Sequence, residues 1–239
     1  MKPRLHSEAD FAALLTSLAE DTFKASVHWR LYQDLISSAR NFAMELEESR
    51  AFWRLTVDAQ RDTTLFRLAR LYDPDALSLP TLLSTIKQNL RLFEKANFRD
   101  RLRVKGNPFA DSLAESASAP DALTLDADCR SVSGSDDRVA RLLEARNRVF
   151  AHRDPGVLLG TRTDPTETLT IDDVDALVQR AAQIMNRYRH LFEATVDQQQ
   201  YVGQDDYKLV FQRIRTCRET RQRELEREYE AIGIKLEEQ

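Results

Sequence analysis

Two long stretches of the chain, residues 7–72 and residues 81–105, contain neither glycine nor proline. These residue types disfavour helices most, because glycine loses the most backbone freedom on ordering and proline lacks the N–H that a helix requires. Only 6 glycines and 7 prolines occur among 239 residues, and no series of segments alternates apolar and polar residues as strands do. The sequence therefore predicts an all-α fold.

Apolar residues at helical spacing, together with capping residues, place the helices along the chain. The segment over residues 106–137 is rich in serine, alanine, aspartate and glycine, and we expect loops around one short helix there. The remaining pattern predicts helices over residues 7–17, 20–46 and 50–71, then one that opens at Ser78 and Pro80 and has an apolar stripe from Leu82 to Phe93.

Two further helices are predicted in the last third of the chain. Thr170 and Asp173 have the spacing of a capping box, and the helix after them carries an apolar stripe of Val174, Leu177, Val178, Ala181, Met185, Tyr188, Phe192 and Val196. Residues 205–239 are highly charged, and we expect a helix that packs near Phe211 and then projects into solvent. Whether this helix grips RNA, braces a dimer or is only solvated stays open. We divide the chain into a helical domain over 1–203, with a loop-rich insertion at 106–137, and an extension over 204–239.

The segment from Arg146 to Asp154 has the sequence RNRVFAHRD and lies at the end of a predicted helix over residues 138–151. We expect Ser133 or Ser135 to cap the start of this helix, and it should pack on the one that follows Asp173. Arginine matches phosphate oxygens with a planar, permanently charged fork, and histidine accepts or donates a proton near neutral pH. The combination suits the handling of a phosphodiester.

The spacing within this segment bears on which side chains meet. His152 lies one helical turn after Arg148, whereas Arg146 is six positions before His152 and is rotated from it by roughly 120°. The two side chains could converge from a groove between packed helices, or a two-fold axis could bring a second copy of the helix alongside. We favour the two-fold axis, which predicts a homodimer through this helix. Whether Arg146 or Arg148 holds the phosphate stays open.

Two blocks of sequence carry a resemblance to a known family. The first runs from Leu68 to Asp75, continues with Leu77-Ser78-Leu79 and ends at Leu82-Leu83, and the second runs from Arg146 to Asp154. Together they resemble the HEPN superfamily, in particular its AbiU-like abortive-infection branch. The resemblance implies an antiparallel helical bundle of HEPN type, here with a long charged C-terminal helix. It also implies dimerisation around the second block and, commonly, a metal-independent endoribonuclease used against phage or as a toxin.

Carried over to this chain, the resemblance implies roles for three residues. Arg146 would stabilise the extra charge on the scissile phosphate, His152 would act on the 2′-hydroxyl or the leaving oxygen, and Asn147 would help to orient them. Some members are silenced by a partner that modifies a tyrosine two residues after the histidine, a position that Asp154 occupies here. No metal or cofactor is implied, and an antitoxin partner stays unknown.

The net charge of −4 indicates that any RNA binding is local, because non-specific binding of a polyanion needs clustered positive charge. We expect Arg141, Arg148 and Arg153, which lie on or just after the predicted helix over residues 138–151 (the motif helix), to contribute to RNA binding. A second basic run covers residues 99–105, where the cations of a solvated helix end are an equally good interpretation.

Composition also bears on the compartment. Cys129 and Cys217 are far apart and have neither metal-binding nor redox spacing, so we expect reduced thiols. No run approaches the roughly 20 apolar residues that cross a bilayer. We therefore expect a cytoplasmic protein without a membrane partner.

The sequence thus favours an RNA-cleaving abortive-infection effector. One alternative is a non-catalytic HEPN domain that binds RNA or a nucleotide as an interaction module. The other is a purely structural motif, in which Arg146 pairs with Glu144, with Asp154 or with an acid of a partner helix.

Overall fold

The computed structural model of the chain describes residues 7–147, 169–198 and 201–232. Every regular element in these ranges is a helix, so the all-α prediction is confirmed. The contacts divide the chain into two compact units, Met1–Trp29 with Arg61–Gln200 (unit 1) and Arg30–Gln60 with Tyr201–Gln239 (unit 2). The domain boundary expected after residue 203 stays a prediction.

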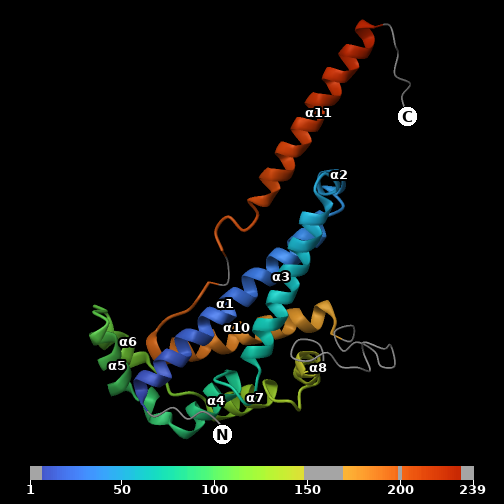
Figure 1. Ribbon diagram of the computed structural model, residues 1–239. Coiled ribbons are helices and arrows are strands. Elements are labelled where there is room, and N and C mark those ends of the chain that lie inside the picture. Colours follow the sequence, from blue (N-terminus) through green and yellow to red (C-terminus); the bar gives the residue numbers. More distant parts are fainter. Residues whose placement is uncertain (1–6, 148–168, 199–200, 233–239) are drawn as a thin grey trace, which may run out of the picture. The chain divides into compact units, whose positions relative to one another are not determined.

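Figure 1 shows the helices, coloured in the order of the chain. They are α1 (Glu8–Ser38), α2 (Ala43–Glu47), α3 (Arg50–Leu71), α4 (Leu79–Gln88), the 3-10 helix η1 (Leu90–Phe93), α5 (Lys95–Val104), α6 (Ala110–Ser116), α7 (Ala122–Ser131), α8 (Asp137–Ala145), α10 (Ile171–Glu193) and α11 (Tyr207–Ala231). Of these, α1 and α3 contribute residues to both units.

The core of unit 1 is built on α10, which packs against α5, η1 and α8, while α4 packs against α7. The predicted stripe of α10 is buried from Val174 to Phe192. Phe192 meets the rings of Phe11 and Phe93 edge-on, with ring centroids 5.0 and 5.9 Å away. Val196 does not continue the stripe and is 60% exposed, because α10 ends at Glu193 and Ala194 adopts a left-handed conformation (φ 54°).

Four helix predictions differ from the structure. The helix predicted over residues 20–46 ends at Ser38, because Phe42 leaves the helical conformation (φ −127°, ψ 29°) and packs against Phe211, and α2 then begins at Ala43. The helix expected to carry a stripe from Leu82 to Phe93 ends at Gln88, because Asn89 is not helical (φ −134°, ψ 49°), and residues 90–93 form the 3-10 helix η1.

The other two differences concern α1 and residues 106–137. The break expected between residues 17 and 20 does not occur. Helix α1 is continuous there because the segment contains no glycine or proline that would end it, and because Leu18 and Ala19 are buried in the core. Residues 106–137 hold two helices, α6 and α7, rather than one. Ala110 and Ala114 of α6 pack against Phe98 and Leu102 of α5, and these small side chains let a short helix lie close to its neighbour.

Unit 2 is held together by the first half of α11. Phe211 is buried against Trp53 and Phe42, with ring centroids 4.6 and 4.9 Å away. The Tyr207 hydroxyl donates a hydrogen bond of 2.7 Å to the Asp34 carboxylate. The packing expected near Phe211 is therefore confirmed within this unit.

Candidate functional site

The helix that leads to the motif, α8, begins at an aspartate rather than at a serine. The Asp136 carboxylate accepts hydrogen bonds from the backbone N–H groups of Arg138 and Val139, at 3.0 and 3.2 Å. The hydroxyls of Ser133 and Ser135 lie 2.6 Å apart and bond to each other instead. The expected serine cap is therefore wrong. A carboxylate is the better cap here because its full charge also suits the positive end of the helix dipole.

Arg146 is the C-cap residue of α8 and follows the buried Ala145. Its Nη1 atom lies 2.5 Å from Oδ2 of Asp73, and both side chains are 24% exposed. Its Nε atom donates a hydrogen bond of 3.0 Å to Oδ1 of Asn147. The guanidinium is thus held by one carboxylate from the connection between α3 and α4 and by the amide of its own neighbour.

Asp73 is itself held on several sides. Its Oδ1 atom accepts the backbone N–H of Asp75 at 3.0 Å, and its backbone carbonyl accepts the Ser78 hydroxyl at 2.5 Å. The preceding residue, Tyr72, is completely buried and donates its hydroxyl to the carbonyl of Leu177 in α10 at 2.8 Å. Burial raises the pKa of Tyr72, which keeps this hydroxyl in its neutral, donating form. The connection therefore presents the Asp73 carboxylate from a fixed backbone.

The sequence alone does not identify Asp73 as the partner of Arg146. The partners considered for Arg146 were Glu144, Asp154 or an acid of a partner helix, whereas Arg146 pairs with Asp73, 73 positions earlier in the chain. The available signal was the position of Asp73 in the first block that carries the family resemblance. The structure brings the two blocks together through this ion pair.

Arg141 lies on α8 and reaches toward α10. Its Nη2 atom is 2.7 Å from Oδ1 of Asp173, and Nε of Arg138 is 3.1 Å from the same atom. Asp173 also forms the predicted capping box with Thr170, which is confirmed. Burial opposes the ionisation of Asp173, but Arg141 and Thr170 outweigh it and lower the pKa of the carboxyl. Arg141 thus ties α8 to α10, and its contribution to RNA binding stays a prediction.

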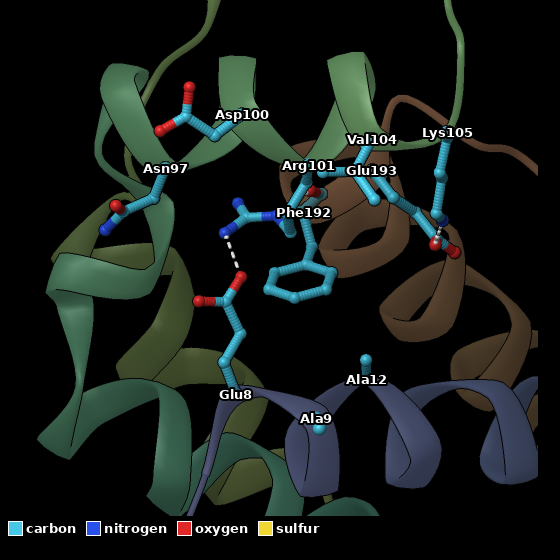
Figure 2. A pocket seen from close by; sticks show the side chains of 10 residues that line it. All are labelled: Glu8, Ala9, Ala12, Asn97, Asp100, Arg101, Val104, Lys105, Phe192 and Glu193. Atoms are coloured by element: carbon cyan, nitrogen blue, oxygen red, sulfur yellow. Dashed lines mark hydrogen bonds and ion pairs between the residues drawn. The ribbon is translucent and has the colours of Figure 1, made fainter.

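The basic run over residues 99–105 is largely neutralised within unit 1. Arg99 and Arg103 pair with Asp111, Arg101 with Glu8 and Lys105 with Glu193. Arg101 also lies over the Phe192 ring, 3.9 Å from its centroid. Figure 2 shows Arg101 and Lys105 turned toward these acids around a pocket of about 420 Å³. The structure favours the interpretation of this run as part of the scaffold rather than as an RNA-binding patch.

His152, Arg148 and Arg153 lie outside the described residues. Within residues 7–147, 169–198 and 201–232, no three His, Cys, Asp or Glu side chains are grouped so as to hold a metal ion. Over the same ranges, no helix has both the length and the apolar character to cross a bilayer. The site that can be described consists of Arg146, Asn147 and Asp73.

A comparison with protein families relates most of the chain to a known family. The model of the family HEPN_AbiU2, described as AbiU2, matches residues 8–210, which include both sequence blocks and the Arg146–Asp73 pair. No curated protein and no solved structure matches the chain. The family match covers most of the chain and confirms the resemblance to the AbiU-like branch of the HEPN superfamily. The chain therefore belongs to the AbiU2 family of HEPN proteins.

Proposed function

We propose that this protein is a metal-independent endoribonuclease of the HEPN type that acts as a toxin or abortive-infection effector. The observation that carries the proposal is the ion pair between Arg146 and Asp73. It fixes the motif arginine at the end of α8, beside Asn147, where a phosphate could be bound by the remaining donors of the guanidinium. A charged, oriented donor of this kind is what a phosphoryl transfer without metal requires.

In the proposed reaction, His152 accepts the proton of a ribose 2′-hydroxyl. The 2′-oxygen then attacks the adjacent phosphorus, and the bond from phosphorus to the 5′-oxygen breaks as that oxygen gains a proton. Arg146 stabilises the extra negative charge that develops on the phosphate oxygens. The products carry a 2′,3′-cyclic phosphate and a 5′-hydroxyl, and the step needs neither an oxidant nor a metal.

The proposal includes a homodimer in which Arg146 of one copy and His152 of the other act on one phosphate. Its support is the rotation of roughly 120° between these two positions on one helix. Arg148 and Arg153, with a smaller share from Arg141, would bind the flanking phosphates. Local contacts of this kind are compatible with a chain whose net charge is −4.

The test of the function is RNA cleavage by the purified protein in EDTA, beside its His152→Ala variant, with a mixed pool of cellular RNA. We expect fragments with cyclic-phosphate ends from the parent protein. The variant should cleave at least about a hundredfold more slowly, because it lacks the proton acceptor. The ends are read by polyadenylation. Fragments with a cyclic phosphate stay resistant after a phosphomonoesterase alone, and they accept a tail only after acid has opened the ring and the phosphomonoesterase has removed the resulting phosphate.

Two results would count against the proposal. Cleavage that disappears in EDTA would indicate a metal-dependent reaction. Intact RNA, combined with an RNA affinity that the His152→Ala variant retains, would instead identify a binding domain of the same fold.

The role of Asp73 gives a separate prediction. Asp73→Asn should slow cleavage roughly tenfold to a hundredfold, because the guanidinium loses the carboxylate that orients it. Stability should fall by less than about 1 kcal/mol, as is usual for a partly exposed ion pair. Cleavage rates and thermal unfolding of the variant measure both effects.

The matched control is Asp75→Asn, which keeps the backbone N–H that donates to Asp73. It should leave the cleavage rate unchanged. Equal losses in the two variants, or a faster Asp73→Asn enzyme, would contradict a positioning role for Asp73.

A further inference from the structure

Arg70 lies on the outward side of the last turn of α3. It and Asp73 are the two residues of the segment 68–73 that are not buried. The backbone N–H of Asp73 donates a hydrogen bond of 3.4 Å to the carbonyl of Arg70, so the chain makes a further turn between the two residues. Side chains three positions apart in a helical turn are neighbours, with Cβ atoms about 5–6 Å apart. Arg70 is therefore a neighbour of the carboxylate that holds Arg146.

Most donors of the Arg70 guanidinium are uncommitted. Its side chain is 57% exposed, and its ion pair within the described residues is a contact of 3.3 Å from Nη2 to Oδ2 of Asp21. Asp21 is held more closely by Arg67, which donates a hydrogen bond of 2.8 Å to Oδ1. The helix dipole favours a base in the last turn of α3, but this interaction uses no N–H donor. Because a guanidinium has five such donors, Arg70 can bind a further anion.

Arg70 and Arg146 are anchored in the same way. Each guanidinium is held on one side by a carboxylate, Asp21 for Arg70 and Asp73 for Arg146. Two arginines and one aspartate therefore lie together at the end of α3 and α8, and this group keeps an excess of positive charge. Such a group attracts an anion with more than one charged oxygen.

The basic residues of α8 and α5 are engaged more fully. Arg138 and Arg141 both bind the Asp173 carboxylate, which ties them to α10. The run over residues 99–105 is paired with acids of unit 1. Arg70 has the longer, more exposed contact and lies three positions before Asp73, so it is better placed than these residues to add an anion contact beside Arg146.

We propose that Arg70 binds the RNA phosphate next to the one that Arg146 binds. The inference rests on the proposed function, and it adds a contact from α3 to those expected from Arg148 and Arg153. Neighbouring phosphates of a strand each carry one negative charge, and two separately anchored guanidinium groups can each bind one of them. Because the neighbouring phosphate does not react, Arg70 binds substrate and transition state equally. It contributes affinity rather than the rate at saturation.

The test is RNA affinity in the full-length His152→Ala protein, which keeps the binding groups but lacks the proton acceptor. The dissociation constant for a single-stranded RNA is measured over a series of salt concentrations, with and without Arg70→Gln. We expect Arg70→Gln to raise the dissociation constant by about fivefold in low salt. It should also reduce the slope of log affinity against log salt by about 0.7, the share of one phosphate contact to a single strand.

Two further variants separate an RNA contact from a structural role. Arg70→Lys should restore most of the slope, because an ammonium group also binds a phosphate as a point charge. Arg91→Gln is the matched control: it removes an exposed arginine of η1 in the same unit, and it should leave the slope unchanged. A purely structural role of Arg70 would lower the unfolding temperature without changing the slope, and that result overturns the proposal.

The cleavage reaction supplies a second readout. With His152 intact, Arg70→Gln should raise the protein concentration that gives half of the maximal single-turnover rate, by the same factor as the dissociation constant. The maximal rate should stay within about twofold of the parent rate. A loss of the maximal rate as large as that of Arg146→Gln would assign Arg70 to the reacting phosphate and overturn the proposal.

The failure of this contact and the failure of the nuclease give different results. If the protein cleaves RNA but the slope is unchanged in Arg70→Gln, or falls equally in Arg91→Gln, the nuclease stands and the Arg70 contact is excluded. If the protein binds RNA without cleaving it and Arg70→Gln alone reduces the slope, the contact stands and the nuclease is excluded. A protein that neither binds nor cleaves RNA overturns both.

Discussion

Arg146→Gln is expected to slow RNA cleavage by about a hundredfold to a thousandfold, the usual loss when one donor to a developing oxyanion is removed. Glutamine keeps much of the length of the side chain but carries no charge. Because Arg146 is the C-cap residue and is only partly buried, the fold should be retained. Single-turnover rates at saturating protein, with unfolding curves for both proteins, measure the effect.

Two further variants test whether the loss of activity depends on the guanidinium group of Arg146 rather than on positive charge alone. Arg146→Lys should recover little of the rate, because an ammonium group cannot bind Asp73 and a phosphate with the planar fork of a guanidinium. Arg138→Gln removes another arginine of the same helix, one that pairs with Asp173, and should leave cleavage nearly unchanged. A fully active lysine variant, or an equal loss in Arg138→Gln, would show that only net positive charge matters.

Mixed dimers of two inactive variants are expected to cleave RNA. In a dimer of one Arg146→Gln copy and one His152→Ala copy, one composite site keeps both groups and the other loses both. Purified mixed dimers should therefore show about half of the parent activity, since a two-fold dimer has two such sites. The two copies are expressed together with different affinity tags, and dimers that carry both tags are assayed.

The control dimers contain the same variant twice under the two tags and should be inactive. If the mixed dimers are also inactive while the parent is active, Arg146 and His152 act within one copy. That result would still support the proposed nuclease activity, but it would exclude an active site shared between two copies. If the parent elutes as a monomer at the concentration at which it cleaves, the same conclusion follows.

The helices that the sequence predicted well are those set by local pattern. The capping box of Thr170 and Asp173 and the buried stripe of α10 depend on residues within a few turns of one another, and both are present. The cap of α8 was missed because Ser133, Ser135 and Asp136 are all good caps. The choice among them depends on backbone geometry that sequence spacing does not specify.

The candidate site was predicted only in part, for a physical reason. Arg146 and Asn147 are neighbours and could be recognised together, but the bond between Arg146 and Asp73 joins positions far apart in the chain. That contact depends on how the end of α8 and the connection after α3 pack. The anchor in that packing is the hydrogen bond from buried Tyr72 to the Leu177 carbonyl, for which the sequence contains no short-range signal.

The passage of α1 and α3 through both units restricts how the chain can be shortened. A fragment that stops before α11 would still contain Leu35 and Trp53, the apolar residues against which Phe211 packs. It would also contain the Glu45 carboxylate without its partners Arg215 and Arg218. An apolar surface exposed by the loss of Phe211 would promote aggregation. The charged extension therefore cannot be removed without consequence, because α11 covers a small core to which residues of α1 and α3 also belong.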